Sequence, residues 1–134
     1  MKKLDGKTER SLILQARKAA EKAYAPFSNV KVGAAILTPG GRIFSGCNVE
    51  NSSYGLCICA ERTAAVKAAS EGVREFEAVA VVSNLEGLTY PCGACRQFLS
   101  EFGPGMSVIV ASPKGKVARH KLSELLPETF LLKK

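Results

Sequence analysis

The chain has 134 residues, 46% of them hydrophobic and 23% charged, which is typical of a single soluble globular domain covering residues 1–134. It contains no apolar run of about 18 residues that would cross a membrane, and charges interrupt the stretch after Lys2 and Lys3 where a signal peptide would need apolar residues. The net charge of +7 is scattered over both termini, without a dense basic run or a tryptophan, which argues against a nucleic-acid polymer as partner.

Hydrophobic periodicity, helix formers and turn residues predict an alternation of helices and strands. In chain order these are a helix (9–24), two strands (30–38 and 43–49), a helix (59–72), a strand (76–83), a helix (93–102), two strands (106–112 and 116–122) and a final helical turn (123–130). This order predicts an α/β protein: a three-layer α/β/α sandwich with helices on both faces of a five-stranded mixed sheet. Strand-to-helix connections lie at one edge of such a sheet, where sites collect.

The five cysteines are an odd number and are not spread as a disulfide framework, which indicates a reducing cytoplasm and thiols used for metal binding or catalysis. Cys92 and Cys95 open one predicted helix, and Cys59 opens another. Three thiolates can hold one zinc ion and leave a fourth position open for water. Glu61 follows Cys59 by two positions and is placed to move protons on that water. Because residues i and i+2 do not share a helix face, Cys59 must then lie at the cap or in the first turn.

Three thiolates give the metal site a net negative charge, which weakens its power to acidify water. Helix N-termini favour thiolates and draw off part of that charge. Arg62 and Arg96 are adjacent cations that can do the same, and we favour Arg62, which is next to Glu61 and close to Cys59. A surface salt bridge is an equally good interpretation of Arg62.

Other interpretations of the cysteines stay open at this level. Cys57 with Cys59, Cys92 and Cys95 would make a closed structural zinc site without an open position. Cys92 and Cys95 alone would make a redox pair at a helix N-terminus. Cys47 lies in an apolar strand run and is expected to be a small core residue.

Two motifs, "CAE" at 59–61 and "PCGAC" at 91–95, resemble those of zinc deaminases. More closely, the chain resembles the small homotetrameric cytidine deaminases of nucleoside salvage. The resemblance is carried by "AYAPFSNVKVGAAILT" (23–38), "GRIFSGCNVENSSYGLCICAERTA" (41–64), "PCGACRQ" (91–97) and "LSELLPETF" (122–130). It covers nearly the whole chain, and the order and spacing of these segments are far more specific than any one of them.

The resemblance implies a cytidine-deaminase-like fold and a zinc-dependent hydrolytic deamination. Cytidine and 2′-deoxycytidine would become uridine and 2′-deoxyuridine in pyrimidine salvage. Cys59, Cys92 and Cys95 would be the ligands of one zinc ion per chain. Glu61 would be the general acid and base that moves protons between water, ring N3 and the departing ammonia.

The resemblance also implies substrate contacts and a shared site. Asn48 and Glu50 would bind the ribose, and the backbone of Ala60 would bind the edge of the base. Tyr54 would lie near a subunit interface, and Phe130 would close over the site of a neighbouring subunit in a homotetramer.

The chain departs from the family at the pocket. Val30 stands where the family has an aromatic residue, and Glu128 and Thr129 replace small residues before the terminal aromatic. An alternative substrate is therefore a related aminopyrimidine, an aminopurine, or a nucleoside antibiotic such as blasticidin S. An alternative of a different class is a structural-zinc or redox protein.

Overall fold

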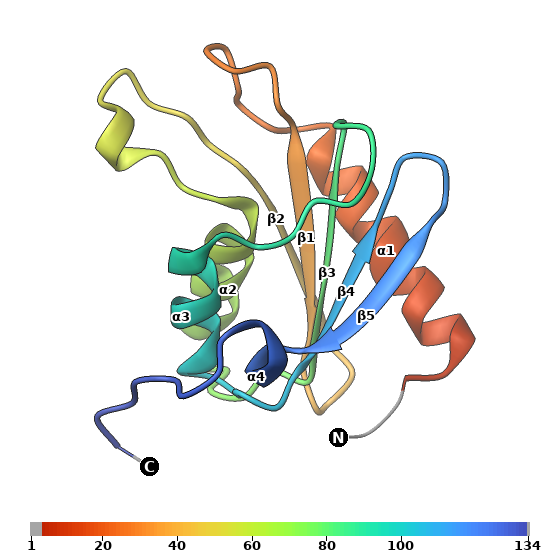
Figure 1. The fold of residues 1–134 in the computed structure, drawn as a ribbon, viewed down its shortest axis with the longest axis vertical. Helices are drawn as coiled ribbons and strands as arrows, with labels where there is room; N and C mark the ends of the chain where they lie inside the picture. Colours follow the sequence, from red (N-terminus) through yellow and green to blue (C-terminus); the bar gives the residue numbers. More distant parts are fainter. Residues whose placement is uncertain (1–3, 134) are drawn as a thin grey trace.

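The structure, a computed structural model, describes residues 4–133 and contains one five-stranded sheet with the strand order β2-β1-β3-β4-β5 (Figure 1). The elements are α1 (Gly6–Ala20), β1 (Val32–Leu37), β2 (Ile43–Cys47), a short 3₁₀ helix η1 (Tyr54–Leu56), α2 (Ala60–Ser70), β3 (Ala78–Ser83), α3 (Gly93–Ser100), β4 (Ser107–Ala111), β5 (Val117–Lys121) and α4 (Leu122–Leu125). Only the β3–β4 pair is parallel among these strands, so the sheet is mixed, as expected from the sequence.

Helices cover both faces of the sheet, because side chains of successive strand residues point to opposite faces. Ala35 and Leu37 of β1 join the core under α1, together with Leu12 and Ala16 of that helix. The residue between them, Ile36, joins the core under α2 and α3. Figure 1 shows α1 on one side of the sheet and α2 and α3 on the other. The predicted three-layer α/β/α sandwich is confirmed.

Two glycines let the helices approach the sheet closely. A Cβ on Gly33 of β1 would lie 1.9 Å from the carbonyl oxygen of Ala16 in α1. A Cβ on Gly46 of β2 would lie 2.6 Å from the backbone nitrogen of Ala64 in α2. Only glycine therefore permits this backbone packing on either face.

Some element boundaries differ from the sequence-based ones. The first helix begins before the predicted residue 9, because the Asp5 side chain caps it by accepting a hydrogen bond from the Thr8 N–H at 2.7 Å. It ends at Ala20, before the predicted residue 24. Tyr24, expected at the end of that helix, instead forms an isolated β-bridge with Val49. The first strand begins at Val32 rather than 30, since the preceding residues bond to asparagine side chains described below.

The sheet has two dissimilar ends. Three connections lie at one end of the sheet: the one before β1, the long loop between β2 and α2, and the loop between β3 and α3 (Figure 1). The tight turn between β1 and β2 lies at the opposite end. Within residues 4–133, none of the helices combines the length and apolar character needed to cross a bilayer.

Candidate active site

Three cysteine sulfurs meet where α2 and α3 begin. Cys59 is the N-cap of α2, Cys92 is the N-cap of α3, and Cys95 lies buried in the first turn of α3. Their Sγ atoms all lie within 4.8 Å of one another, and those of Cys59 and Cys92 are 3.7 Å apart. A tetrahedral zinc ion with Zn–S bonds of about 2.3 Å separates its sulfurs by about 3.8 Å. The cluster therefore fits the zinc site that the sequence predicts.

The protonation of these thiols also fits a cation. The pKa of Cys59 falls to about 5, first because Cys95 donates a hydrogen bond to its thiolate and then through Arg62 and Cys92, while burial opposes the shift. The pKa of Cys95 rises, because it donates that hydrogen bond and because it is buried near Glu61 and the other thiols. Sulfurs this close repel one another once ionised, so a soft divalent cation is the group this donor set fits.

Glu61 lies in the first turn of α2 and has only 3% of its surface exposed. Burial is the main cause that raises its pKa to about 7; the Cys59 thiolate adds to the rise, while its own backbone N–H and Arg62 oppose it. The position of Cys59 at the cap meets the geometric condition set by the sequence. A buried carboxyl group that titrates near neutrality can both accept and release a proton.

The two candidate cations have different partners. Arg62 donates from Nη2 to the Cys59 sulfur at 3.6 Å, and its Nε is buried without a hydrogen-bond partner among residues 4–133. The salt bridges among the described residues join Arg42 to Glu71 and Arg119 to Glu9, and neither involves Arg62. Arg96 instead donates to the carbonyl oxygens of Pro91 and Leu125, each at 2.8 Å. Arg62 therefore faces the thiols, whereas Arg96 holds the backbone before α3 and at the end of α4.

The remaining cysteines stay outside the cluster. The Cys57 sulfur accepts a hydrogen bond from the Asn51 N–H at 3.3 Å and lies 3.8 Å from the Asn51 carbonyl oxygen. Cys57 is not part of the only group of possible metal ligands found among the described residues. The closed four-thiol site is therefore wrong. Cys47 ends β2 and is only partly buried, so the core position expected for it is only partly borne out.

Glu50 holds the loop before β1. Its Oε1 accepts hydrogen bonds from the N–H groups of Phe27 at 2.9 Å and Ser28 at 3.2 Å, and its Oε2 contacts the Ser28 hydroxyl. The Ser28 hydroxyl is the main cause that lowers the pKa of Glu50. A hollow of about 310 Å³ lies here, lined by Phe27, Ser28, Glu50, Tyr54 and Cys57.

Asn48 joins the segment around Val30 to the end of β2. Its Oδ1 accepts from the Val32 N–H and its Nδ2 donates to the Val30 carbonyl, both at 2.8 Å. Each of these atoms has capacity for one more hydrogen bond, because Nδ2 carries a second hydrogen and Oδ1 a second lone pair.

The other residues named from the sequence lie as follows. Ala60 is fully buried in the first turn of α2, and Val30 is partly buried. Tyr54 is 72% exposed in η1, where its ring meets that of Phe27 edge-on with centroids 5.7 Å apart. Phe130 is 67% exposed, and its carbonyl accepts from Gln97 Nε2 at 2.9 Å.

Sequence reasoning missed Ser28 and Asn84. The Ser28 hydroxyl accepts from the Val30 N–H at 3.0 Å, and Asn84 bonds to Asn29 and Lys31. In the structure β2 and β3 flank β1, and each is followed directly by an asparagine, Asn48 and Asn84. The strand order, which the sequence patterns did not predict, is needed to relate the two.

Comparison with known proteins identifies the family. Residues 7–111 match the model of the cytidine and deoxycytidylate deaminase zinc-binding region. The chain belongs to the cytidine and deoxycytidylate deaminase family. A cytidine deaminase of Sporosarcina psychrophila is 50% identical over 120 residues, which are 89% of this chain and 88% of the relative.

Solved structures of this deaminase family share the fold. The 1.6 Å crystal structure of cytidine deaminase from Burkholderia pseudomallei is similar with a TM-score of 0.87 at 51% identity, covering 90% of this chain and 98% of that one. The cytidine deaminase of Mycobacterium tuberculosis gives a TM-score of 0.81 at 38% identity, covering 97% and 100%. As a member of the family, the protein is a zinc-binding hydrolytic deaminase. The interpretation of Cys92 and Cys95 as a redox pair is therefore wrong.

Proposed function

We propose that this deaminase converts cytidine and 2′-deoxycytidine to uridine and 2′-deoxyuridine in pyrimidine salvage. The observation that carries the proposal is Glu61, a buried carboxyl group whose pKa is raised to about 7. It lies two residues after Cys59, one of the three clustered thiols. Relatives at 50% and 47% identity are both named cytidine deaminase, which supports the choice of substrate.

Bound zinc supplies a Lewis acid that makes water a better nucleophile near neutral pH. The chain's own residues do the rest. Glu61 accepts a proton from the attacking water and delivers it to ring N3 of the base. It then accepts the second proton of that oxygen and delivers it to the amino group of the base, which leaves as ammonia. Its burial keeps bulk water from competing for these protons. Arg62 balances the charge of the thiolates, and the Ala60 backbone binds the edge of the base.

Glu50 and Asn48 are proposed to bind the ribose. Glu50 lines the hollow of about 310 Å³ and is ionised at neutral pH, since its pKa is lowered, so it can accept hydrogen bonds from sugar hydroxyls. Asn48 keeps one hydrogen and one lone pair for the substrate after it has bonded to Val30 and Val32. Val30 would form an aliphatic wall beside the base.

The proposal includes a cytoplasmic homotetramer with shared sites, built from one domain over residues 1–134. Tyr54, Leu56 and Phe130 are 72%, 65% and 67% exposed in this chain, which is unusual for large apolar side chains and typical of subunit contacts. Tyr54 would pack at such a contact, and Phe130 would close over the site of a neighbouring subunit. An active monomer by light scattering would contradict the shared site.

The experiment is a screen of ammonia release by the purified zinc-loaded protein. Cytidine, 2′-deoxycytidine, cytosine, adenosine, guanine and blasticidin S are each supplied at the same concentration. We expect release from the two cytosine nucleosides, with uridine or 2′-deoxyuridine as the other product. Turnover of guanine or blasticidin S without turnover of cytidine would replace the proposed substrate and would point to the aliphatic wall at Val30 as the reason.

A further inference from the structure

The segment that carries Val30 is not held by a neighbouring strand. Asn29 adopts a left-handed backbone conformation with φ of 61°, which asparagine tolerates better than most residues. After this turn the chain runs toward β1, but the ladders of β1 with β2 and β3 begin only at Val32 or Gly33. Residues 29–31 therefore need other partners for their backbone groups.

Two asparagines supply these partners in the same way from opposite sides. The backbone N–H of Asn48 donates to the Val32 carbonyl at 3.2 Å, its Oδ1 accepts from the Val32 N–H, and its Nδ2 donates to the Val30 carbonyl. The backbone N–H of Asn84 donates to the Lys31 carbonyl at 3.0 Å and its Oδ1 accepts from the Lys31 N–H at 3.0 Å. Its Nδ2 donates to the Asn29 carbonyl at 2.9 Å.

The pattern is identical and offset by one residue along the segment. In an extended chain, alternate residues direct their N–H and C=O groups to opposite sides. Val30 and Val32 therefore face Asn48, which follows β2, while Asn29 and Lys31 face Asn84, which follows β3. Each side-chain amide takes the place of the next backbone amide of a strand that has already ended.

We propose that Asn84 is a positioning residue for the nucleoside pocket, which bonds to the segment on the side opposite to Asn48, and that it sets the position of the Val30 side chain. The proposal rests on the proposed function for the role of Val30 as pocket wall. Asn84 also begins the connection that ends at Cys92, so one loop links the wall of the pocket to the metal centre. The Asn84 side chain bonds to Lys31 and Asn29, so we expect it to affect substrate binding and not zinc.

Steady-state kinetics on cytidine with Asn84→Ala and Asn84→Asp tests the proposal. Asn84→Ala removes two side-chain hydrogen bonds from the segment that carries Val30. We expect it to raise KM roughly fivefold, with kcat within about twofold and zinc content unchanged. Asn84→Asp keeps the acceptor for the Lys31 N–H and loses the donor to Asn29. Its KM should therefore lie between those of the wild type and the alanine variant.

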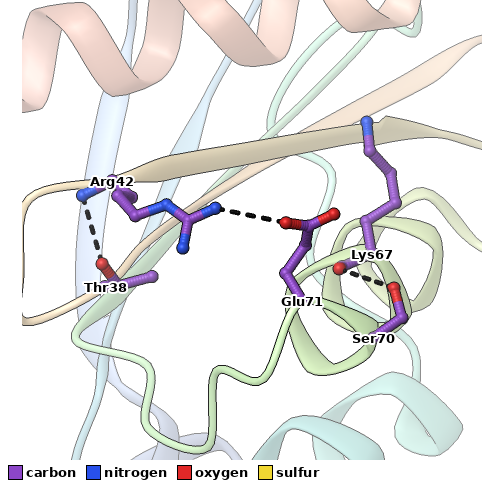
Figure 2. Close-up of polar contacts among 5 residues, drawn as sticks. All are labelled: Thr38, Arg42, Lys67, Ser70 and Glu71. Atoms are coloured by element: carbon purple, nitrogen blue, oxygen red, sulfur yellow. Dashed lines mark hydrogen bonds and ion pairs between the residues drawn. The ribbon is translucent and has the colours of Figure 1, made fainter.

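Thr38→Val is the matched control. Figure 2 shows the Thr38 hydroxyl, which accepts a hydrogen bond from the Arg42 N–H at 3.1 Å in the turn at the other end of β1. This variant loses one side-chain-to-backbone bond just beyond the opposite end of β1, far from Val30. It should lower the melting temperature by less than Asn84→Ala, which loses two such bonds, and leave KM unchanged.

Two kinetic outcomes would overturn the proposal. One is an unchanged KM in Asn84→Ala with a lowered melting temperature, the behaviour expected of Thr38→Val, which would make Asn84 purely structural. The other is a parallel loss of zinc and kcat. Hydrogen exchange of the Lys31 amide gives a readout that does not depend on activity: it should quicken in Asn84→Ala, and unaltered exchange contradicts the proposal. If the wild type does not deaminate cytidine, the proposed function fails by itself, and the exchange result still decides whether Asn84 holds the segment.

Discussion

The helical layers on the two faces of the sheet are packed alike but begin differently. On both faces a glycine of the sheet, Gly33 or Gly46, allows a helix backbone to approach closely. At the start of α1 the Asp5 side chain accepts a hydrogen bond from the first turn. At the starts of α2 and α3 the N-cap residues are Cys59 and Cys92, and neither side chain caps its own helix.

This difference shows how the fold separates stability from chemistry. The Asp5 carboxylate takes up one of the free N–H groups of the first turn and faces the positive end of the α1 dipole, so it stabilises the helix itself. Cysteine caps leave the positive ends of α2 and α3 directed at thiolates, where they favour the ionised form that binds metal. The α1 face therefore serves packing, and we expect the α2/α3 face to carry the chemistry.

Removing one thiol should have the largest effect. Cys59→Ala leaves two sulfurs for the metal, so we expect the purified protein to lose its zinc and all measurable deamination while α1 and its core stay folded. Metal analysis of protein purified without added zinc, together with circular dichroism, measures both.

Cys57→Ala is the control for that experiment, because Cys57 is two residues away and bonds to Asn51 instead of the cluster. It should keep about one zinc per chain. Zinc loss in Cys57→Ala would bring back the four-thiol site and contradict the assignment.

A pair of glycine variants compares the two faces directly. Gly33→Ala and Gly46→Ala each force a Cβ against helix backbone, and each should cost about 2–3 kcal/mol of unfolding free energy. Only Gly46→Ala displaces α2, which carries Cys59 and Glu61, so only this variant should also lower kcat of the folded enzyme, by roughly tenfold. Urea unfolding measures the free energy of unfolding, and kinetics normalised to the concentration of active sites measure kcat. Equal kcat losses in both variants would remove the distinction between the faces.

A smaller effect is expected from the charge that faces the thiols. Arg62→Met removes the donor to the Cys59 sulfur and should weaken zinc affinity about tenfold to a hundredfold, measured by competition with a chelator. Arg74→Met is the control on the same side of the sheet, because Arg74 donates to the Ala69 carbonyl near the other end of α2. Equal affinities in the two variants would mean that Arg62 does not support the metal.

Patterns along the chain predicted the layers, the mixed sheet and the three thiols, because each depends on local spacing: strand runs, helix formers, and cysteines at strand-to-helix connections. The role of Arg62 over Arg96 could not be decided in this way, since both directly follow a helix-opening motif and only side-chain direction separates them. Asn84 was missed for a related reason. Its bonds reach Asn29 and Lys31, more than fifty residues earlier, and only the placement of β3 beside β1 brings them together.

We expect the three thiols to hold the metal and Glu61 to move the protons. Zinc content and cytidine turnover measured on one preparation of Glu61→Gln test these roles most directly. The glutamine has the same size but cannot accept a proton, so we expect about one zinc per chain, a wild-type fold and turnover lowered roughly 10²- to 10⁴-fold. Turnover near that of the wild type, with zinc retained, would contradict the role of Glu61.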